Sequence, residues 1–250
     1  RTERTAAILL DQLRGALNRE VREIIELISA DQTADAIKRL DTLRSRSSFG
    51  QHLVRPWRVA ICGPPNAGKS SLHNALLGYE RSIISPLPGT TRDVLTNTVA
   101  LDGWPVELAD TAGLREAVDS LESAGVHQAR KHFDQVDLLL LVVDASTAWQ
   151  TSHLGFLSDK AEAITVFNKA DLPAAISPDQ QPGLRVSART GQGIEELIRE
   201  MIRLLVPDPP APRAAVPFTT RQADLIGSAY DRALANDIPR TLSLLPRVNG

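Results

Sequence analysis

The stretch V-A-I-C-G-P-P-N-A-G-K-S-S, residues 59–71, decides the fold of this chain. It completes the phosphate-binding pattern G-x-x-x-x-G-K-[ST] with Gly63, Gly68, Lys69 and Ser70. An apolar, β-prone run precedes this loop and a helix-compatible run follows it, so backbone N–H groups and a helix N-terminus can face a phosphate. We expect the Lys69 ammonium to reach the β- and γ-phosphates of a nucleotide and the Ser70 hydroxyl to bind Mg²⁺.

The composition is that of an ordinary globular protein, with 250 residues of which 42% are hydrophobic and 23% are charged. The net charge of −2 gives no overall basic field of the kind that attracts nucleic acids. The single cysteine, Cys62, excludes a disulfide within the chain and favours a reducing, cytoplasmic location. The longest apolar run, residues 138–143, has the length of a strand, so we expect no membrane partner.

Residues 56–206 alternate strand and helix patterns and form the expected main domain. This alternation predicts an α/β fold with a mostly parallel sheet, one antiparallel edge strand and helices on both faces. The pair Asp102-Gly103 predicts a hairpin turn that makes the antiparallel edge. Strands are expected at 57–62, 94–101, 104–109, 138–143, 163–167 and 184–186. Helices are expected at 69–77, 119–133, 150–160 and 193–205.

Helical patterns flank this domain. Residues 1–55 form an expected N-terminal helical segment, in which one apolar stripe runs through Leu10, Leu13, Leu17, Val21, Ile24 and Ile28. Residues 207–217 contain five prolines and predict a semi-rigid linker. Residues 218–250 resume a helical pattern, in which Thr219 or Thr220 can cap a helix.

Four further segments follow the phosphate-binding loop, namely P-G-T-T-R-D (88–93), D-T-A-G (110–113), N-K-A-D (168–171) and S-A (187–188). Open α/β sheets bind ligands at the carboxyl ends of their strands, where we expect all five segments. A threonine of the first can close over the γ-phosphate and complete the Mg²⁺ shell. In the second, Asp110 can hold Mg²⁺ through water, and the Gly113 N–H can sense the γ-phosphate.

The N-K-A-D segment indicates which base is bound. The Asp171 carboxylate can accept hydrogen bonds from N1–H and N2–H₂ of guanine together, an arrangement that adenine cannot offer. A backbone N–H of the Ser187-Ala188 pair can meet guanine O6. The five segments in this order predict a Ras-like P-loop GTPase rather than an ATPase or an ATP-binding kinase.

The same motifs resemble those of a known family. P-N-A-G-K-S-S (65–71), P-G-T-T-R-D (88–93) and D-T-A-G-L-R-E (110–116), followed by Glu122, are similar to the TrmE-type GTPases, the tRNA-modification GTPase family MnmE/TrmE. The related Der and Era families share the first three motifs more loosely. The resemblance covers residues 56–206 and is weak on either side. It implies hydrolysis of GTP to GDP and phosphate, a role in modifying the wobble uridine of tRNAs, and a flavin-containing partner enzyme.

The resemblance also implies how hydrolysis is catalysed. Ras-type GTPases orient the attacking water with a glutamine directly after D-T-A-G, where this chain has Leu114. In the family, G domains pair face to face as a transient homodimer, and K⁺ in the interface takes the place of an arginine finger. Glu122 matches the family's water-positioning glutamate. Its sequence neighbours alone, among them Glu116 and Asp119, are instead typical of a solvent-exposed helix.

With the resemblance included, the expected site has three parts. The catalytic roles belong to Glu122, Lys69 and Thr91. The expected Mg²⁺ ligands are Ser70, Thr91 and Asp110, and the implied K⁺ ligands are the Asn66 side chain and backbone carbonyls near Ser85, Leu87 and Thr90. The residues expected to bind GTP or GDP with its cations are Asn66, Ala67, Gly68, Lys69, Ser70, Ser71, Ser85, Thr90, Thr91, Asp110, Thr111, Ala112, Gly113, Asn168, Lys169, Asp171, Ser187, Ala188 and Arg189.

The sequence departs from the family pattern in three places. It contains no counterpart of the family's folate-binding domain, and it ends R-V-N-G where the family carries C-x-G-K. His73 stands where the phosphate-loop helix usually carries leucine. We therefore expect an intact GTPase machinery and a modification chemistry that needs more than these 250 residues. The rival hypothesis is an Era- or Der-like GTP-dependent switch in the assembly of the ribosome or another complex, although no second G domain or KH-type G-x-x-G loop appears.

Overall fold

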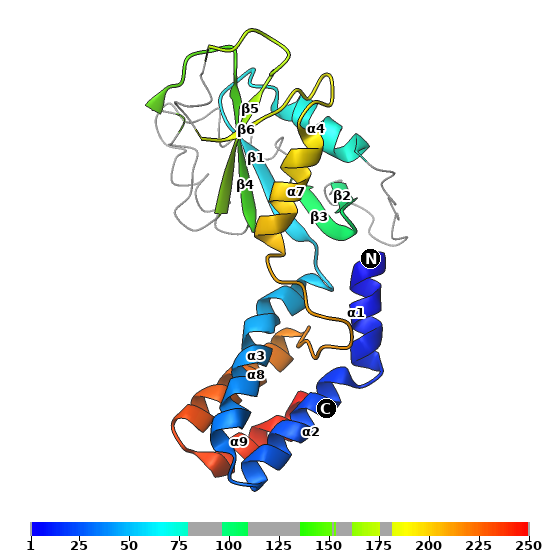
Figure 1. Cartoon of the computed structure of the whole chain (residues 1–250), viewed down its shortest axis with the longest axis vertical. Coiled ribbons are helices and arrows are strands. Elements are labelled where there is room, and N and C mark those ends of the chain that lie inside the picture. Colours follow the sequence, from blue (N-terminus) through cyan, green and yellow to red (C-terminus); the bar gives the residue numbers. More distant parts are fainter. Residues whose placement is uncertain are drawn as a thin grey trace, which may run out of the picture. The chain divides into compact units, whose positions relative to one another are not determined.

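The computed structural model describes residues 2–79, 97–109, 136–151, 153, 162–175 and 182–249. The chain divides into two compact units, shown in Figure 1. One unit is Pro56–Pro207, and the other combines Arg1–Arg55 with Asp208–Gly250. Among the described helices, none has the length and apolar content needed to cross a membrane.

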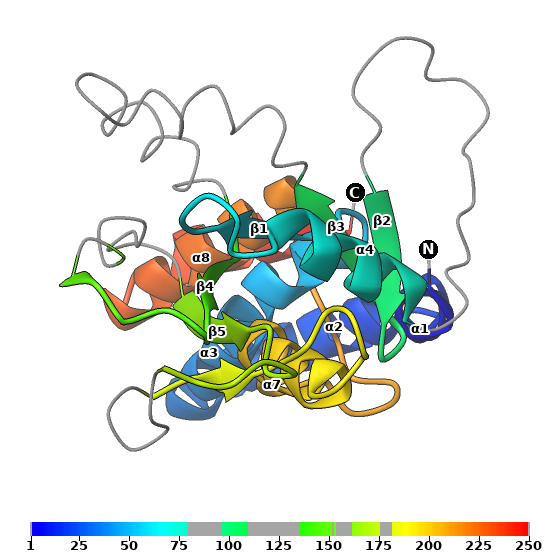
Figure 2. The same ribbon diagram turned by 90° about the horizontal axis from the view of Figure 1, so that it is seen from above.

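The unit Pro56–Pro207 is built on a sheet whose described strands follow the order β2-β3-β1-β4-β5-β6. These strands are β1 (Trp57–Cys62), β2 (Asn97–Leu101), β3 (Trp104–Ala109), β4 (Leu138–Asp144), β5 (Glu162–Asn168) and β6 (Leu184–Arg185). Every neighbouring pair is parallel except β2 and β3, which are antiparallel at the sheet edge (Figure 2). The predicted fold class, a mostly parallel sheet with one antiparallel edge strand, is confirmed.

The hairpin between β2 and β3 turns where the sequence predicts it. Asp102 and Gly103 have φ angles of 46° and 76°, so both turn residues are in the left-handed region. A two-residue turn of this kind matches the twist of the strands that it joins. Leu101 pairs with Trp104 directly beside the turn.

The centre of the sheet is apolar on both faces. The six residues from Leu138 to Val143 in β4 are all fully buried, as expected for a parallel strand covered on both sides. Two helices belong to this unit in the described residues, α4 (Lys69–Gly78), which contacts β1, and α7 (Ile194–Leu205), which contacts β4. The helix predicted at 119–133, and most of that predicted at 150–160, lie outside the described residues.

The second unit is helical and draws on both ends of the chain. Its elements are α1 (Glu3–Leu13), α2 (Ala16–Ser29), α3 (Thr33–His52), α8 (Thr220–Leu234), α9 (Ile238–Leu244) and the 3₁₀ helix η2 (Leu245–Val248). One apolar core joins α2, α3, α8, α9 and η2, with Leu40 of α3 and Ile226 of α8 both fully buried. Thr219 is the residue that caps α8, and Gln222 completes a capping box with it.

The predicted apolar stripe of the N-terminal segment is wrong at its beginning. Gly15, with a φ of 88°, separates α1 from α2, so the stripe does not continue along one helix. Leu17 and the later stripe residues are buried, whereas Leu10 and Leu13 are 48% and 82% exposed. A periodic pattern does not reveal such a break, because glycine is tolerated within helices at a modest cost.

The proline-rich segment is non-helical, as its prolines require, but its second half packs into the helical unit. Ala215 and Val216 are buried. The buried side chain of Gln12 donates a hydrogen bond to the carbonyl of Ala214 (3.0 Å) and accepts one from the Val216 N–H (3.0 Å). This half of the segment is therefore held in place by α1 and does not act as a free spacer.

Candidate nucleotide-binding site

The phosphate-binding loop connects β1 to α4 in a conformation that only particular residues permit. Gly63, Asn66 and Gly68 have positive φ angles of 133°, 60° and 91°. A Cβ atom on Gly63 would lie 2.1 Å from the Val142 carbonyl oxygen, so the loop needs glycine there. Lys69 Nζ donates hydrogen bonds to the carbonyl oxygens of Gly63 (2.9 Å) and Pro64 (2.8 Å), so its ammonium lies over the loop.

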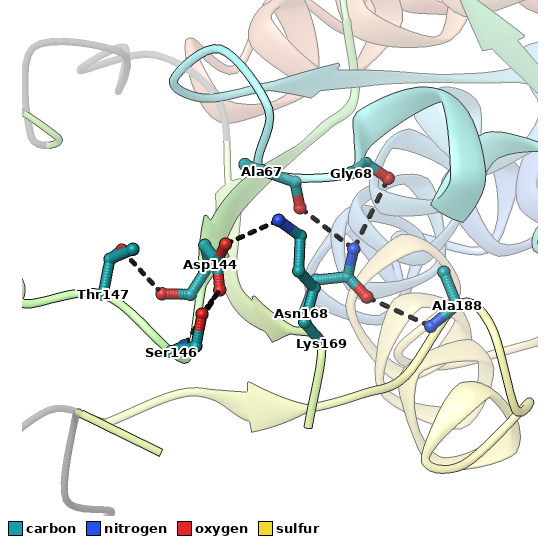
Figure 3. Close-up of polar contacts among 8 residues, drawn as sticks. All are labelled: Ala67, Gly68, Asp144, Ser146, Thr147, Asn168, Lys169 and Ala188. Carbon is teal, nitrogen blue, oxygen red and sulfur yellow. Dashed lines mark hydrogen bonds and ion pairs between the residues drawn. The ribbon is translucent and has the colours of Figure 1, made fainter. Parts of the chain in front are cut away.

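Asn168 connects this loop to the two other loops of the site (Figure 3). Its side-chain amide donates to the Ala67 carbonyl at 3.0 Å, and its side-chain oxygen accepts from the Ala188 N–H at 3.0 Å. A Cβ on Gly68 would lie 2.2 Å from Asn168 Nδ2, which shows how closely the two segments approach. The side chain is buried, so these bonds are shielded from water.

Asp171 forms the acidic end of the site. Its two carboxylate oxygens accept from the Ser187 hydroxyl (2.5 Å) and pair with the Arg189 guanidinium (2.6 Å). The Ser187 hydroxyl is the main cause that lowers the pKa of Asp171, and Arg189 adds to it against the opposing effect of burial. The carboxylate is therefore ionised at neutral pH and can act as an acceptor for two donors on a ligand.

These residues enclose a pocket of about 260 Å³. It is lined by Gly68, Ser71, Asn168, Lys169, Asp171, Leu172, Ala188 and Arg189. All of them except Leu172 are among the residues predicted to bind the nucleotide. Leu172 could have been found from the sequence, because it directly follows N-K-A-D and lies in the same turn as Asp171.

Asp144 is a second residue that the motifs did not reveal. Its carboxylate pairs with Lys169 Nζ at 2.6 Å and accepts from the Ser146 N–H (2.9 Å) and hydroxyl (2.6 Å). Burial raises the pKa of Asp144, but the hydrogen bonds from Lys169 and Ser146 outweigh burial and lower it. Asp144 could have been found from the sequence, because it follows the apolar run of β4 directly and so lies at the same sheet edge as the motifs.

The other predicted residues divide into two groups. Asn66 and Ser70 are exposed, Asn66 in the phosphate-binding loop and Ser70 in the first turn of α4. The remaining predicted residues lie outside the described residues; they are Ser85, Leu87, Thr90, Thr91, Asp110, Thr111, Ala112, Gly113 and Glu122.

Comparison with known proteins agrees with this geometry. Residues 58–169 match the family model described as 50S ribosome-binding GTPase. The chain is 41% identical over 187 residues to the tRNA modification GTPase MnmE of Akkermansia muciniphila, covering 71% of this chain and 41% of that protein. It is 38% identical over 198 residues to MnmE of a Synechococcus species, covering 78% of this chain and 43% of that protein. The chain thus spans less than half the length of these relatives.

Among solved structures, the G domain of the T. maritima FeoB iron transporter aligns with 60% of this chain and 99% of its own length, at 22% identity and a TM-score of 0.41.

A phosphate-binding loop that meets the N-K-A-D and S-A loops on one mostly parallel sheet, together with the matching GTPase family model, identifies a P-loop GTPase domain. The domain is similar to the tRNA modification GTPases MnmE, so the resemblance to that family is confirmed.

Proposed function

We propose that this chain hydrolyses GTP to GDP and phosphate with the help of Mg²⁺. The observation that carries the proposal is the junction at Asn168, which joins the phosphate-binding loop to the loops that carry Asp171 and Ala188. Phosphates and a base can therefore be held by one rigid set of loops. Catalysis then consists of positioning and of stabilising charge.

The phosphate end of the site fits a nucleotide with its metal ion. The positive φ angles at Gly63, Asn66 and Gly68 allow successive backbone N–H groups to face a phosphate, and Ser70 lies in the first turn of α4. Ser70 would hold Mg²⁺ together with Thr91 and Asp110, and the ion would neutralise developing phosphate charge. The Lys69 ammonium exchanges its two carbonyl partners for phosphate oxygens when GTP binds.

The base end of the site fits guanine. The ionised Asp171 carboxylate accepts from guanine N1–H and N2–H₂. In the Ser187-Ala188 pair, the Ala188 N–H, which donates to Asn168 in this structure, meets O6 when the base binds. The substitution Asp171→Asn tests this role, because the new amide can donate to the O2 of xanthine. Nucleotide preference should move from guanine toward xanthine in competition binding, and a retained GTP preference would disprove the assignment.

We further propose that hydrolysis is stimulated by K⁺ and by transient pairing of two G domains. Asn66 supplies a side-chain ligand, and carbonyls near Ser85, Leu87 and Thr90 supply the others. Glu122 positions the attacking water, a task that Leu114 cannot perform. The site residues that remain, Ser71, Thr111, Ala112, Gly113 and Arg189, contact the nucleotide.

Turnover of GTP in potassium and in sodium salts of equal ionic strength tests this mechanism. Association state is followed in parallel with GDP and aluminium fluoride, a mimic of the transition state. Strong K⁺ dependence with dimer formation supports pairing. Slow turnover that ignores K⁺, with a monomer throughout, contradicts it.

The wider role that we propose is modification of the tRNA wobble uridine in the cytoplasm with a flavin-containing partner enzyme, because the curated relatives are tRNA modification GTPases. The name of the matching family model, 50S ribosome-binding GTPase, favours a second candidate, a GTP-dependent switch in ribosome assembly. Deleting the gene separates the two: loss of the wobble modification supports the first, and accumulation of immature large subunits supports the second.

A further inference from the structure

Asp144 connects β4 to the wall of the nucleotide pocket. In the β4–β5 register it pairs with Asn168, so Lys169 is the next residue beyond that pair. Figure 3 shows the Lys169 side chain reaching back to the Asp144 carboxylate, where the ion pair spans 2.6 Å. The two side chains are only 33% and 15% exposed, so water screens this pair less than a surface pair.

Asp144 is itself held in place. Ser146 donates to its carboxylate from both its N–H and its hydroxyl, and the Thr147 hydroxyl donates to its backbone carbonyl at 3.0 Å. A carboxylate with this many fixed donors has one preferred orientation. It can therefore fix the position of the lysine that it binds.

The pair changes what Lys169 offers to a ligand. Lys169 lines the pocket beside Asp171 and Leu172, but its charge is neutralised by Asp144. What remains for the ligand is the chain of four methylene groups, an apolar surface. A free lysine would lose rotamer freedom on forming such a surface, whereas a held lysine has already lost it, and preorganisation of this kind strengthens binding.

We propose that Asp144 is a positioning residue of the base pocket, which holds the Lys169 ammonium so that the lysine stem forms an apolar wall against the purine ring of a guanine nucleotide. This inference rests on the proposed function of the pocket. Because the base is common to GTP and GDP, the wall contributes equally to the binding of both. A residue that contacted the phosphates would instead change the affinities for GTP and GDP by different factors.

The test is a double-mutant cycle with Asp144→Asn and Lys169→Met, read out as the Kd of unlabelled GDP and GTP by calorimetry. Asp144→Asn should raise both Kd values by the same factor, about tenfold, as expected for loss of a charged hydrogen bond. The same substitution should have almost no further effect in the Lys169→Met background. In turnover, the loss should appear in KM rather than in kcat. The matched control is Glu200→Gln, which breaks the exposed Glu200–Arg203 pair of α7 and should leave both Kd values unchanged.

Two results overturn the inference. If Asp144→Asn lowers the melting temperature but leaves both Kd values at the wild-type level, the pair is purely structural. If the effects of Asp144→Asn and Lys169→Met add independently, Asp144 does not act through Lys169. Failure of the proposed function looks different, because the wild-type chain would then bind GDP no better than ADP.

Discussion

The side-chain amide of Asn168 donates a hydrogen bond to the backbone carbonyl of Ala67, which lies 101 residues earlier in the sequence. Asn168 also accepts from the Ala188 N–H, so one side chain joins three loops. Loss of this junction should affect the folded state and ligand binding together, because the same loops form the pocket.

We expect Asn168→Ala to destabilise the chain by about 2–3 kcal/mol, since it leaves the carbonyl of the buried Ala67 and the N–H of the half-buried Ala188 without their partner. The affinity for GDP should fall at least tenfold because the loops lose their common anchor. Urea denaturation and calorimetric titration measure the two effects. Asn74→Ala, at an exposed position of α4, is the control and should change neither.

The pH dependence of stability should report Asp171. Because the Ser187 hydroxyl and Arg189 lower its folded-state pKa, its contribution is fully present above the unfolded pKa of about 3.9. That contribution is lost as the pH falls through the lower folded-state pKa. Melting temperatures of the wild type and Asp171→Asn should therefore differ by a constant amount from pH 7 to pH 5 and converge below pH 4. Convergence already near pH 6 would contradict a lowered pKa.

Gln12 should be essential to the packing of the proline-rich segment. Its buried amide bonds to Ile8, Ala214 and Val216. Gln12→Met keeps the volume but removes these bonds, so unfolding in urea should require about 2 kcal/mol less free energy. The control is Asn18→Met, at an exposed position of α2. If it lowered the free energy of unfolding by the same amount, the loss in Gln12→Met would have another cause than these hydrogen bonds.

His73 should be a site where stability can be gained. Its Nε2 atom is buried, and it has no hydrogen-bond partner in the part of the chain that the structure describes. His73→Leu removes this unpaired polar atom and should raise stability by about 1 kcal/mol, or the melting temperature by about 2–4 °C. His73→Gln keeps a polar group at the position and should give no gain; a gain of the same size would refute the explanation.

The Cys62 thiol should be unreactive toward disulfide reagents in the folded chain. Burial raises the pKa of its thiol to about 12, although the nearby Lys69 acts in the opposite direction. At pH 8 a disulfide reagent such as DTNB should detect no thiol in the native protein and one per chain in guanidinium. Rapid labelling of the native protein would show that the strand before the phosphate-binding loop opens easily.

Local chemistry made much of this protein predictable from its sequence. The strand-to-helix loop at 63–70 and the N-K-A-D segment could be recognised because close approach of backbone to phosphate and bidentate recognition of guanine each need particular residues in a set order. The apolar run at 138–143 identified the central strand of a parallel sheet, and Asp102-Gly103 identified its antiparallel edge.

The tertiary structure decided the relationships that depend on register and on partners. Sequence spacing does not show that Asp144 reaches Lys169, because that contact exists only in the β4–β5 register. Nor does it show that α3 and α8 share one core, or that Leu17 is buried while Leu13 is exposed. A periodic apolar stripe indicates which residues can be buried together. The surface that covers them comes from distant parts of the chain, which the stripe does not identify.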